Sequence, residues 1–207
     1  MSNIEFDEHP PWRSPEVPLL NFKHLFINKN VVDLGCGSGD AMLYIRDGIG
    51  CNSIIGYNFD LERSKKNRES NNLNIIGGNF LEKKFEGKDT YFLWIEAVTT
   101  EVKVLQKLRE YKKHTGKKCD VIIAYSISGS CLFDKSVPNE NKKWGGNMCK
   151  DQKGAACRYR SGVGGLVNKL ESFLVNNSFS FEKKLCNYNN GNGCRESGEI
   201  LYFVINI

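Results

Sequence analysis

The stretch VVDLGCGSGD at residues 31–40 decides the fold. It starts as a short apolar run that ends in an acid, which predicts a buried strand. Three glycines then follow at every second position, and DAMLYIRD at 40–47 predicts a helix of about two turns. A strand, a glycine turn and a helix in this order form the first βα unit of a parallel sheet. The glycines let the backbone approach a ligand closely, because no Cβ stands in the way.

Apolar runs outside this unit predict the remaining elements. We expect strands at 53–59, 73–80, 89–97 and 119–128. We expect helices at 19–26, 60–72, 99–116 and 162–177, and a closing antiparallel hairpin from 178–188 and 198–207. The predicted class is α/β, a doubly wound Rossmann-like sheet with right-handed crossovers. Such sheets bind ligands at the carboxyl ends of their strands.

Length and composition favour one ordinary domain. The chain has 207 residues, 40% of them hydrophobic, and a net charge of +5. We divide it into an N-terminal entrance segment at 1–29 and a main domain at 30–207 with an insertion at 132–162. No apolar run suits a bilayer span, and the first residues do not form a signal peptide, so we expect a cytoplasmic protein without membrane contact. Residues 134–160 hold seven Lys or Arg and three acids, typical of a solvated loop or a surface for an acidic partner.

The cysteines and histidines give no sign of a metal site. None of the eight cysteines forms a C-x-x-C pair, and we expect neither a structural metal nor a disulfide framework. The histidines, His9, His24 and His114, are scattered and form no cluster visible in the sequence.

The residues of the glycine loop argue against a phosphate ligand. A dinucleotide loop needs Gly or Ala at position 40, where Asp40 would repel a pyrophosphate. The G-K-[ST] tripeptide of a triphosphate loop is missing from the sequence. Two acids, Asp33 and Asp40, instead suit a cationic ligand.

The stretch VVDLGCGSGD resembles the first motif of the class I S-adenosylmethionine-dependent methyltransferases. That resemblance implies a seven-stranded sheet over roughly residues 30–207, with S-adenosylmethionine as the cofactor and the glycine loop around its methionine part. A glycine turn that only permits packing is the alternative. The cofactor residues that the resemblance implies are Asp33, Gly35, Cys36, Gly37, Gly39, Asn58, Phe59, Asn79 and Phe80.

Two positions depart from the pattern of this family. Asn58 stands where the family usually has an acid that binds both ribose hydroxyls, and Asn79 stands where an acid often lies near the adenine amino group. An amide can accept one hydrogen bond and donate another, so both exchanges weaken the expected contact. Asp60 could substitute for Asn58, although we favour a role for Asp60 as a helix cap.

The methyl acceptor is expected just after the strand at 89–97. There the resemblance makes Glu96 the candidate for orienting the acceptor or receiving its proton, with a solvated carboxylate as the alternative. The local sequence WIEA lacks the Pro-Pro-aromatic and Pro-Cys motifs of base methylation. We predict transfer to N or O of a protein side chain or a small molecule, with RNA as an alternative acceptor and an inactive scaffold as a further alternative.

The segments around the main domain offer weaker signals about the acceptor. The proline-containing N-terminus is similar to the entrance segment of small protein-lysine methyltransferases. Trp12 or Trp144 could line an acceptor channel, and the glycines of the insertion at 132–162 suit a lid. We expect Trp94 in the core.

Overall fold

The fold is an α/β sheet flanked by helices. The computed structural model describes residues 4–6, 16–83, 87–95, 100–127, 167–189 and 197–207. Its sheet has eight strands in the order β1-β7-β8-β6-β5-β2-β3-β4. The strands are β1 (Ile4–Phe6), β2 (Asn30–Leu34), β3 (Ser53–Asn58), β4 (Ile75–Gly77), β5 (Thr90–Ile95), β6 (Asp120–Ile127), β7 (Ser180–Asn189) and β8 (Ser197–Asn206).

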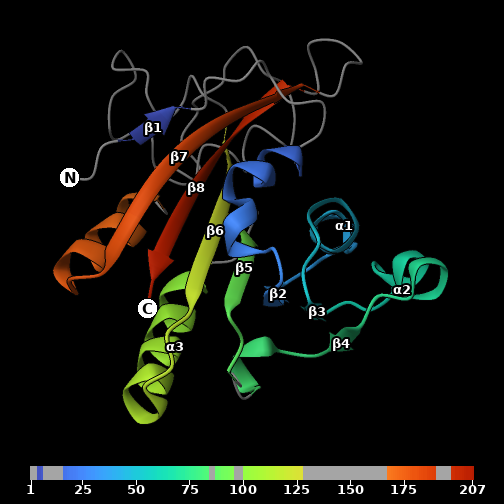
Figure 1. Cartoon of the computed structure of the whole chain (residues 1–207), viewed down its shortest axis with the longest axis horizontal. Coiled ribbons are helices and arrows are strands. Elements are labelled where there is room, and N and C mark those ends of the chain that lie inside the picture. The colour runs from blue at the N-terminus through green and yellow to red at the C-terminus, as the bar shows by residue number, and fades with distance from the viewer. Residues whose placement is uncertain (1–3, 7–15, 84–86, 96–99, 128–166, 190–196) are drawn as a thin grey trace.

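The helices are mostly short. They are the 3-10 helix η1 (Val17–Leu25), α1 (Asp40–Leu43), the π-helix η2 (Tyr44–Ile49), α2 (Lys65–Asn71), the 3-10 turn η3 (Phe80–Glu82), α3 (Glu101–Thr115) and a helix at 167–176. In Figure 1, α1 and α2 lie next to β2, β3 and β4, whereas α3 lies next to β5 and β6. None of the helices in the described part of the chain is long and apolar enough to cross a membrane.

The sheet has the predicted doubly wound topology. Strands β2 to β6 pair in parallel, with β2 in the middle and the order reversing between β3 and β5. The last strand, β8, runs antiparallel to both β6 and β7. This confirms the α/β class and the antiparallel C-terminal hairpin.

The eighth strand, β1, was not expected from the sequence. It pairs in parallel with β7, so that Ile4 lies opposite Lys183 and Phe6 opposite Leu185. A strand of three residues in a proline-rich segment has no periodicity to detect. Its pairing depends on the free edge of β7, which is distant in the sequence.

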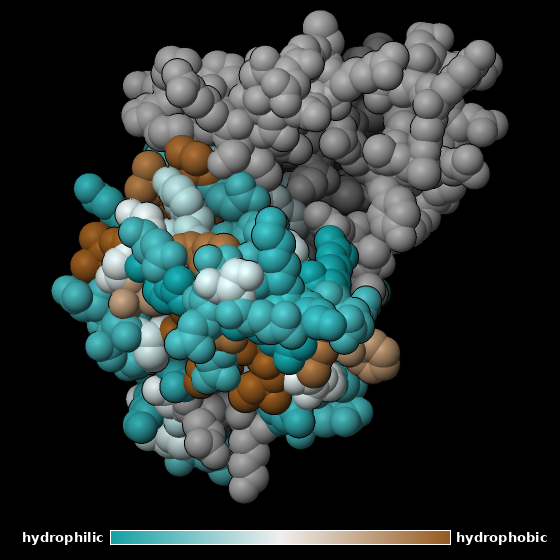
Figure 2. All heavy atoms as spheres, turned by 90° about the vertical axis from the view of Figure 1, so that its right-hand side faces the viewer, coloured by the Kyte–Doolittle hydropathy of each residue, from teal (hydrophilic) through white to brown (hydrophobic). Residues whose placement is uncertain are grey.

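Both faces of the sheet are covered by apolar side chains. Leu105 and Leu108 of α3 and Leu170 of the helix at 167–176 pack on one face. Residues of η1, α1 and η2 pack on the other, where Phe92 and Trp94 meet edge to face with centroids 6.2 Å apart. Trp94 is half-buried there, in agreement with its expected place in the core. The outer surface over α1 and α2 is largely hydrophilic, with small apolar areas between the polar side chains (Figure 2).

The helix predicted at 60–72 is shorter than expected. Helix α2 begins at Lys65, after a turn at 61–64. Leu61 in this turn packs on β4, where a Cβ at Gly77 would lie 2.9 Å from Leu61 Cδ1. Asp60 therefore does not cap α2, because its Oδ1 accepts a hydrogen bond from the Glu62 amide within the turn, at 3.0 Å.

Candidate functional site

The glycine loop leaves β2 at the carboxyl edge of the parallel strands. Gly35, Gly37 and Gly39 all adopt positive φ, at 85°, 55° and 89°. The amides of Gly35 and Cys36 both donate to the Tyr57 carbonyl at the end of β3, at 2.9 and 3.0 Å. The Gly39 amide donates to the Cys36 carbonyl at 2.8 Å. The loop is therefore a folded turn of left-handed residues, tied to the neighbouring strand.

Two of the glycines serve different purposes. A Cβ at Gly39 would lie 2.9 Å from Leu73 Cδ1 and 3.2 Å from Ile75 Cδ1, so this glycine lets the loop pack on β4. A Cβ at Gly37 would lie 3.6 Å from the Arg63 guanidinium, which is an ordinary contact with a flexible, exposed side chain. Gly37 is thus the glycine whose surface a ligand could reach.

Asp33 is the buried acid of this site. It lies in β2 beside Gly56 of β3 and Phe92 of β5, and it is 1% exposed. Neither carboxylate oxygen has a hydrogen-bond partner among the described residues. Burial raises the pKa of Asp33 to about 8, because water is not there to stabilise the ionised form. A cation that approached this carboxylate would favour ionisation, so Asp33 is a ready counter-ion.

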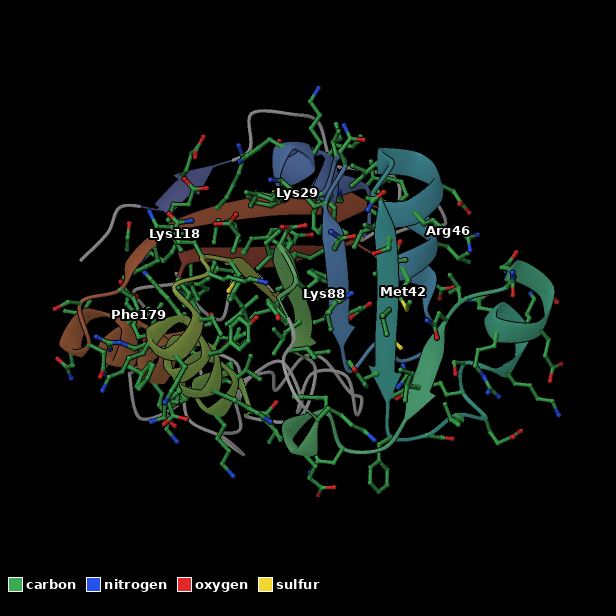
Figure 3. The ribbon with its side chains drawn as sticks, turned by 60° about the horizontal axis from the view of Figure 1, so that its bottom comes forward. Lys29, Met42, Arg46, Lys88, Lys118 and Phe179 are labelled. Carbon is green, nitrogen blue, oxygen red and sulfur yellow. The ribbon has the colours of Figure 1, made fainter. Side chains whose placement is uncertain are left out.

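The Cys36 side chain points away from the open side of the loop. It is buried, and a Cβ at Gly56 would lie 2.8 Å from its Sγ and close to Met42 Sδ as well. Met42 of α1 lies against β3 (Figure 3). Burial, with the nearby Asp33 carboxyl, raises the pKa of the Cys36 thiol, so it stays protonated and acts as a core residue. Only the backbone of Cys36 is placed to meet a ligand.

Asn58 ties the glycine loop to the turn after β3. Its Nδ2 donates to the Gly37 carbonyl at 2.8 Å and to the Asp60 carbonyl at 2.6 Å. The amide group of this side chain is thus engaged with the backbone, and the Oδ1 atom is left as its acceptor. The next residue, Phe59, is 86% exposed. An aromatic ring so exposed at the edge of a site offers a face to a planar ligand.

Asn79 and Phe80 follow β4 along the same edge. Asn79 Oδ1 accepts from the Leu81 amide at 3.0 Å, and Asn79 Nδ2 donates to Glu82 Oε1 at 3.1 Å. Asn79 Oδ1 therefore caps η3 while its Nδ2 bonds to the Glu82 side chain, and a ligand would have to compete with both hydrogen bonds. The Phe80 ring lies beside the loop, since a Cβ at Gly35 would be 3.9 Å from its Cε1.

Asp40, the second acid of the loop, is held on a different surface. Its Oδ2 accepts from Ser38 Oγ at 2.6 Å and its Oδ1 from Asn67 Nδ2 at 2.9 Å. It lines a shallow hollow together with Glu16, Tyr44 and Asp47. Of the two acids that suggested a cationic ligand, Asp33 alone is buried without a partner.

Four further predictions fall outside the described residues. They are Glu96, Trp12, Trp144 and the insertion at 132–162. The structure therefore brings together the glycine loop with Asp33, Asn58 and Phe80, and leaves the expected acceptor group as a prediction.

Sequence reasoning missed a buried carboxyl next to the expected acceptor segment. Glu101 starts α3 and is 1% exposed, and its pKa is raised by burial. It lies beside Tyr125, whose pKa is raised by burial and by the Glu101 carboxyl. Tyr125 is the strand partner of Ile95, the last residue before 96–99. The sequence gives no sign of this pair, because Glu101 looks like an ordinary first-turn acid of a helix.

Arg63 is the second residue that the sequence did not single out. It lies in the turn after β3 and reaches back to Gly37. In the sequence it is one of several cations in a polar stretch. Only the turn at 61–64 brings it to the loop.

Known proteins match this chain in structure. No protein-family model matches it, and no curated protein matches it in sequence. A SAM-dependent methyltransferase from Aquifex aeolicus matches with a TM-score of 0.56 at 13% identity, over 94% of this chain and 90% of its own. Precorrin-6y C5,15-methyltransferase from Geobacter metallireducens matches at 0.57 and 11% identity, over 93% and 85%. A putative RNA methyltransferase from Pyrococcus horikoshii matches at 0.55 and 13%, over 98% and 92%.

These matches define the class of fold. The chain has the α/β fold of the S-adenosylmethionine-dependent methyltransferases, as the resemblance of its glycine loop predicted. The neighbours carry names with different acceptors, so a shared fold does not identify a substrate.

Proposed function

We propose that this protein is a methyltransferase that uses S-adenosylmethionine and transfers the methyl group to N or O of a protein side chain or a small molecule. The observation that carries the proposal is Asp33, whose buried carboxyl group has no partner among the described residues and lies beside a loop of three left-handed glycines. The fold places this loop at the carboxyl edge of the first βα unit, where ligands of such sheets bind.

The residues at this edge fit the parts of that cofactor. Asp33 suits the ammonium group, and the backbone at Gly35 and Gly37 allows close approach. The Oδ1 atom of Asn58 is free to accept from a ribose hydroxyl. Phe59 and Phe80 offer aromatic surface to an adenine ring.

The cofactor supplies a methyl group already activated by a sulfonium, so the chain has to align the acceptor and exclude water. Glu96, predicted to orient the acceptor or receive its proton, stays part of the proposal. Glu101 is a second carboxyl group near the end of β5, because it lies beside Tyr125, the strand partner of Ile95.

Proton release tests the role of Asp33. Because its pKa is about 8, Asp33 is mostly protonated at pH 7, and a bound ammonium group should expel that proton. We expect calorimetric titration with S-adenosylmethionine at pH 7, in two buffers of different ionisation enthalpy, to show release of close to one proton. Binding of NAD or ATP in preference to S-adenosylmethionine would contradict the proposal.

Turnover separates an enzyme from an inactive scaffold. Cell extract divided into protein, RNA and small molecules would be offered as acceptor with methyl-labelled cofactor. Label in the protein or small-molecule fraction, with formation of S-adenosylhomocysteine, is the expected result. Label only in RNA would move the acceptor to the alternative class, and cofactor binding without label in any fraction would favour the scaffold.

A further inference from the structure

A second surface lies at the opposite edge of the parallel strands. Helix α3 runs from the carboxyl end of β5 back to the amino end of β6, and its last turns face the segment at 173–179. Between them lies a hollow of about 730 Å³. Arg109, Lys112 and Lys113 line it from α3, and Phe173 and Phe179 line it from the other side. Phe179 and Lys118 lie on the α3 side of the molecule (Figure 3).

The rim of this hollow carries an excess of positive charge. We define the basic cluster as Arg109, Lys112 and Lys113, the three cationic side chains that line the hollow. Glu110 also lines the hollow and is the one acid among its described lining residues, so the cations are in excess. Within the described parts of the chain no member of the cluster forms an ion pair. A helix dipole needs only about half a positive charge at its C-terminus, so capping of α3 does not explain three cations.

Two aromatic side chains, Phe173 and Phe179, line the hollow. The rings of Phe173 and Phe179 are 5.8 Å apart between centroids and inclined by 33°. The Arg109 guanidinium lies 5.0 Å from the Phe179 centroid. Its Nη1 donates to the Asn177 carbonyl at 3.1 Å, which fixes the guanidinium over the ring. Both phenylalanines are half-buried, so each keeps part of its surface open to the hollow.

We propose that this hollow binds single-stranded nucleic acid. Unpaired cations attract the phosphates of a strand, and aromatic rings beside them give its bases a surface for stacking. An acidic peptide would use the charges but not the rings. In a duplex the base faces are already stacked on one another, so a duplex would leave the rings without a partner.

This inference goes beyond methyl transfer and does not depend on it. Helix α3 has 15 residues and is about 22 Å long at 1.5 Å per residue. A strand that occupied the hollow and also reached the glycine-loop edge would have to run along most of the length of α3. The hollow would thus hold a long nucleic acid at a distance from the candidate site.

Fluorescence anisotropy with the full chain tests the proposal. The probes are a labelled 15-nucleotide uridine RNA and the corresponding thymidine DNA, each titrated without cofactor at several salt concentrations. The variant Lys112→Gln/Lys113→Gln removes two cations of the hollow. The control Lys65→Gln/Lys66→Gln removes two exposed lysines from α2, at the other end of the sheet.

We expect the hollow variant to lower the slope of log affinity against log salt by about 1.4, because each phosphate contact on a single strand contributes ~0.7. The control should keep the wild-type slope. Phe179→Leu should weaken binding about 10-fold without changing the slope, because stacking carries no charge. Tighter binding of the RNA or of the DNA probe identifies which strand the hollow prefers.

Three results would overturn the proposal. The hollow variant could bind RNA and DNA as the wild type does, or the control could lose as much affinity as the hollow variant. A poly-glutamate peptide could also compete as well as the oligonucleotides, which would identify an acidic protein as the partner. The variant Lys112→Gln/Lys113→Gln tests binding of nucleic acid to the hollow even if Phe179→Leu does not fold. Calorimetry with S-adenosylmethionine is a separate measurement, so failure of this proposal leaves the proposed methyl transfer standing.

Discussion

The two edges of the parallel strands present chemically different groups. At the carboxyl edge, the groups proposed to meet a ligand are the glycine backbone, the buried carboxyl group of Asp33 and the side-chain amide of Asn58, which bonds to the backbone. At the amino edge, the groups are the cationic side chains of Arg109, Lys112 and Lys113 in the last turns of α3, all of them at least partly exposed.

This difference separates two kinds of recognition. A buried charge interacts strongly and tolerates little displacement, because it is not screened by water or salt. Exposed cations interact weakly one by one, respond to salt and accept many geometries. The carboxyl edge therefore suits one small ligand in one orientation, and the amino edge suits a flexible polyanion.

Replacing Asp33 by Asn tests the carboxyl edge most directly. We expect Asp33→Asn to lower the affinity for S-adenosylmethionine at least about 100-fold, because a charge-assisted contact with an ammonium group is lost at a buried position. Calorimetry measures the affinity and should also show that proton release disappears. Unchanged affinity would contradict the view that the carboxyl edge binds its ligand through a buried acid, because Asp33 would then contribute nothing to binding.

The same variant should be more stable than the wild type. Between pH 4 and 8 the unfolded chain releases the Asp33 proton while the folded chain retains it, so wild-type stability falls as the pH rises through that window. Asp33→Asn removes this dependence and should raise the free energy of unfolding at pH 7 by about 2–4 kcal/mol. Urea unfolding at pH 5, 7 and 8 measures it. A variant less stable than the wild type at pH 8 would show that Asp33 has a partner.

The variants Gly39→Ala and Gly37→Ala test whether the two glycines have different roles in the loop. Gly39→Ala should lower the free energy of unfolding by about 2–3 kcal/mol, because the new Cβ meets Leu73 and the backbone stays left-handed. Gly37→Ala should cost about 1 kcal/mol, from φ alone. Thermal and urea unfolding compare the two variants. Equal losses would show that packing on β4 does not distinguish these glycines.

Most of the fold could be predicted from local sequence. Dense apolar runs such as the one in β5 determine buried strands, and the helix expected at 99–116 is α3, which ends at the left-handed Gly116. The predicted start of α2 was wrong because Leu61, in the turn after β3, packs on Gly77 of β4, and the periodicity of a local sequence does not contain such a contact. The π-helical form of η2 was not predicted either.

The candidate site was predictable only in part, for a physical reason. Glycine spacing announces a close backbone approach, so the loop after β2 could be located from the letters alone. The direction in which each side chain points could not be predicted in this way. Cys36 turns into the core, Asp40 turns to Asn67, and Arg63 turns toward Gly37, because neighbouring elements decide each direction.

Arg63 provides a test within the carboxyl edge that the sequence did not suggest. Its guanidinium beside Gly37 suits the carboxylate of the cofactor's amino acid part. Arg63→Gln should weaken S-adenosylhomocysteine about 5- to 10-fold, as expected for a partly exposed charged contact. Methylthioadenosine, which lacks the carboxylate, should bind equally to both proteins in calorimetry. A parallel loss for both ligands would instead give Arg63 a structural role.

The smallest expected effect concerns Glu101, which lies at the carboxyl edge but faces Tyr125 rather than the glycine loop. Above pH 4.5, the ordinary value for Glu, the unfolded chain releases a proton that buried Glu101 retains, so stability falls with rising pH until the folded carboxyl ionises too. Glu101→Gln should therefore raise the melting temperature at pH 7 by about 1–3 °C and leave cofactor affinity unchanged. Differential scanning calorimetry at pH 5 and 7 measures the shift. A loss of cofactor affinity in this variant would extend the ligand site from the glycine loop to the start of α3, and the carboxyl edge would then bind its ligand with two buried acids.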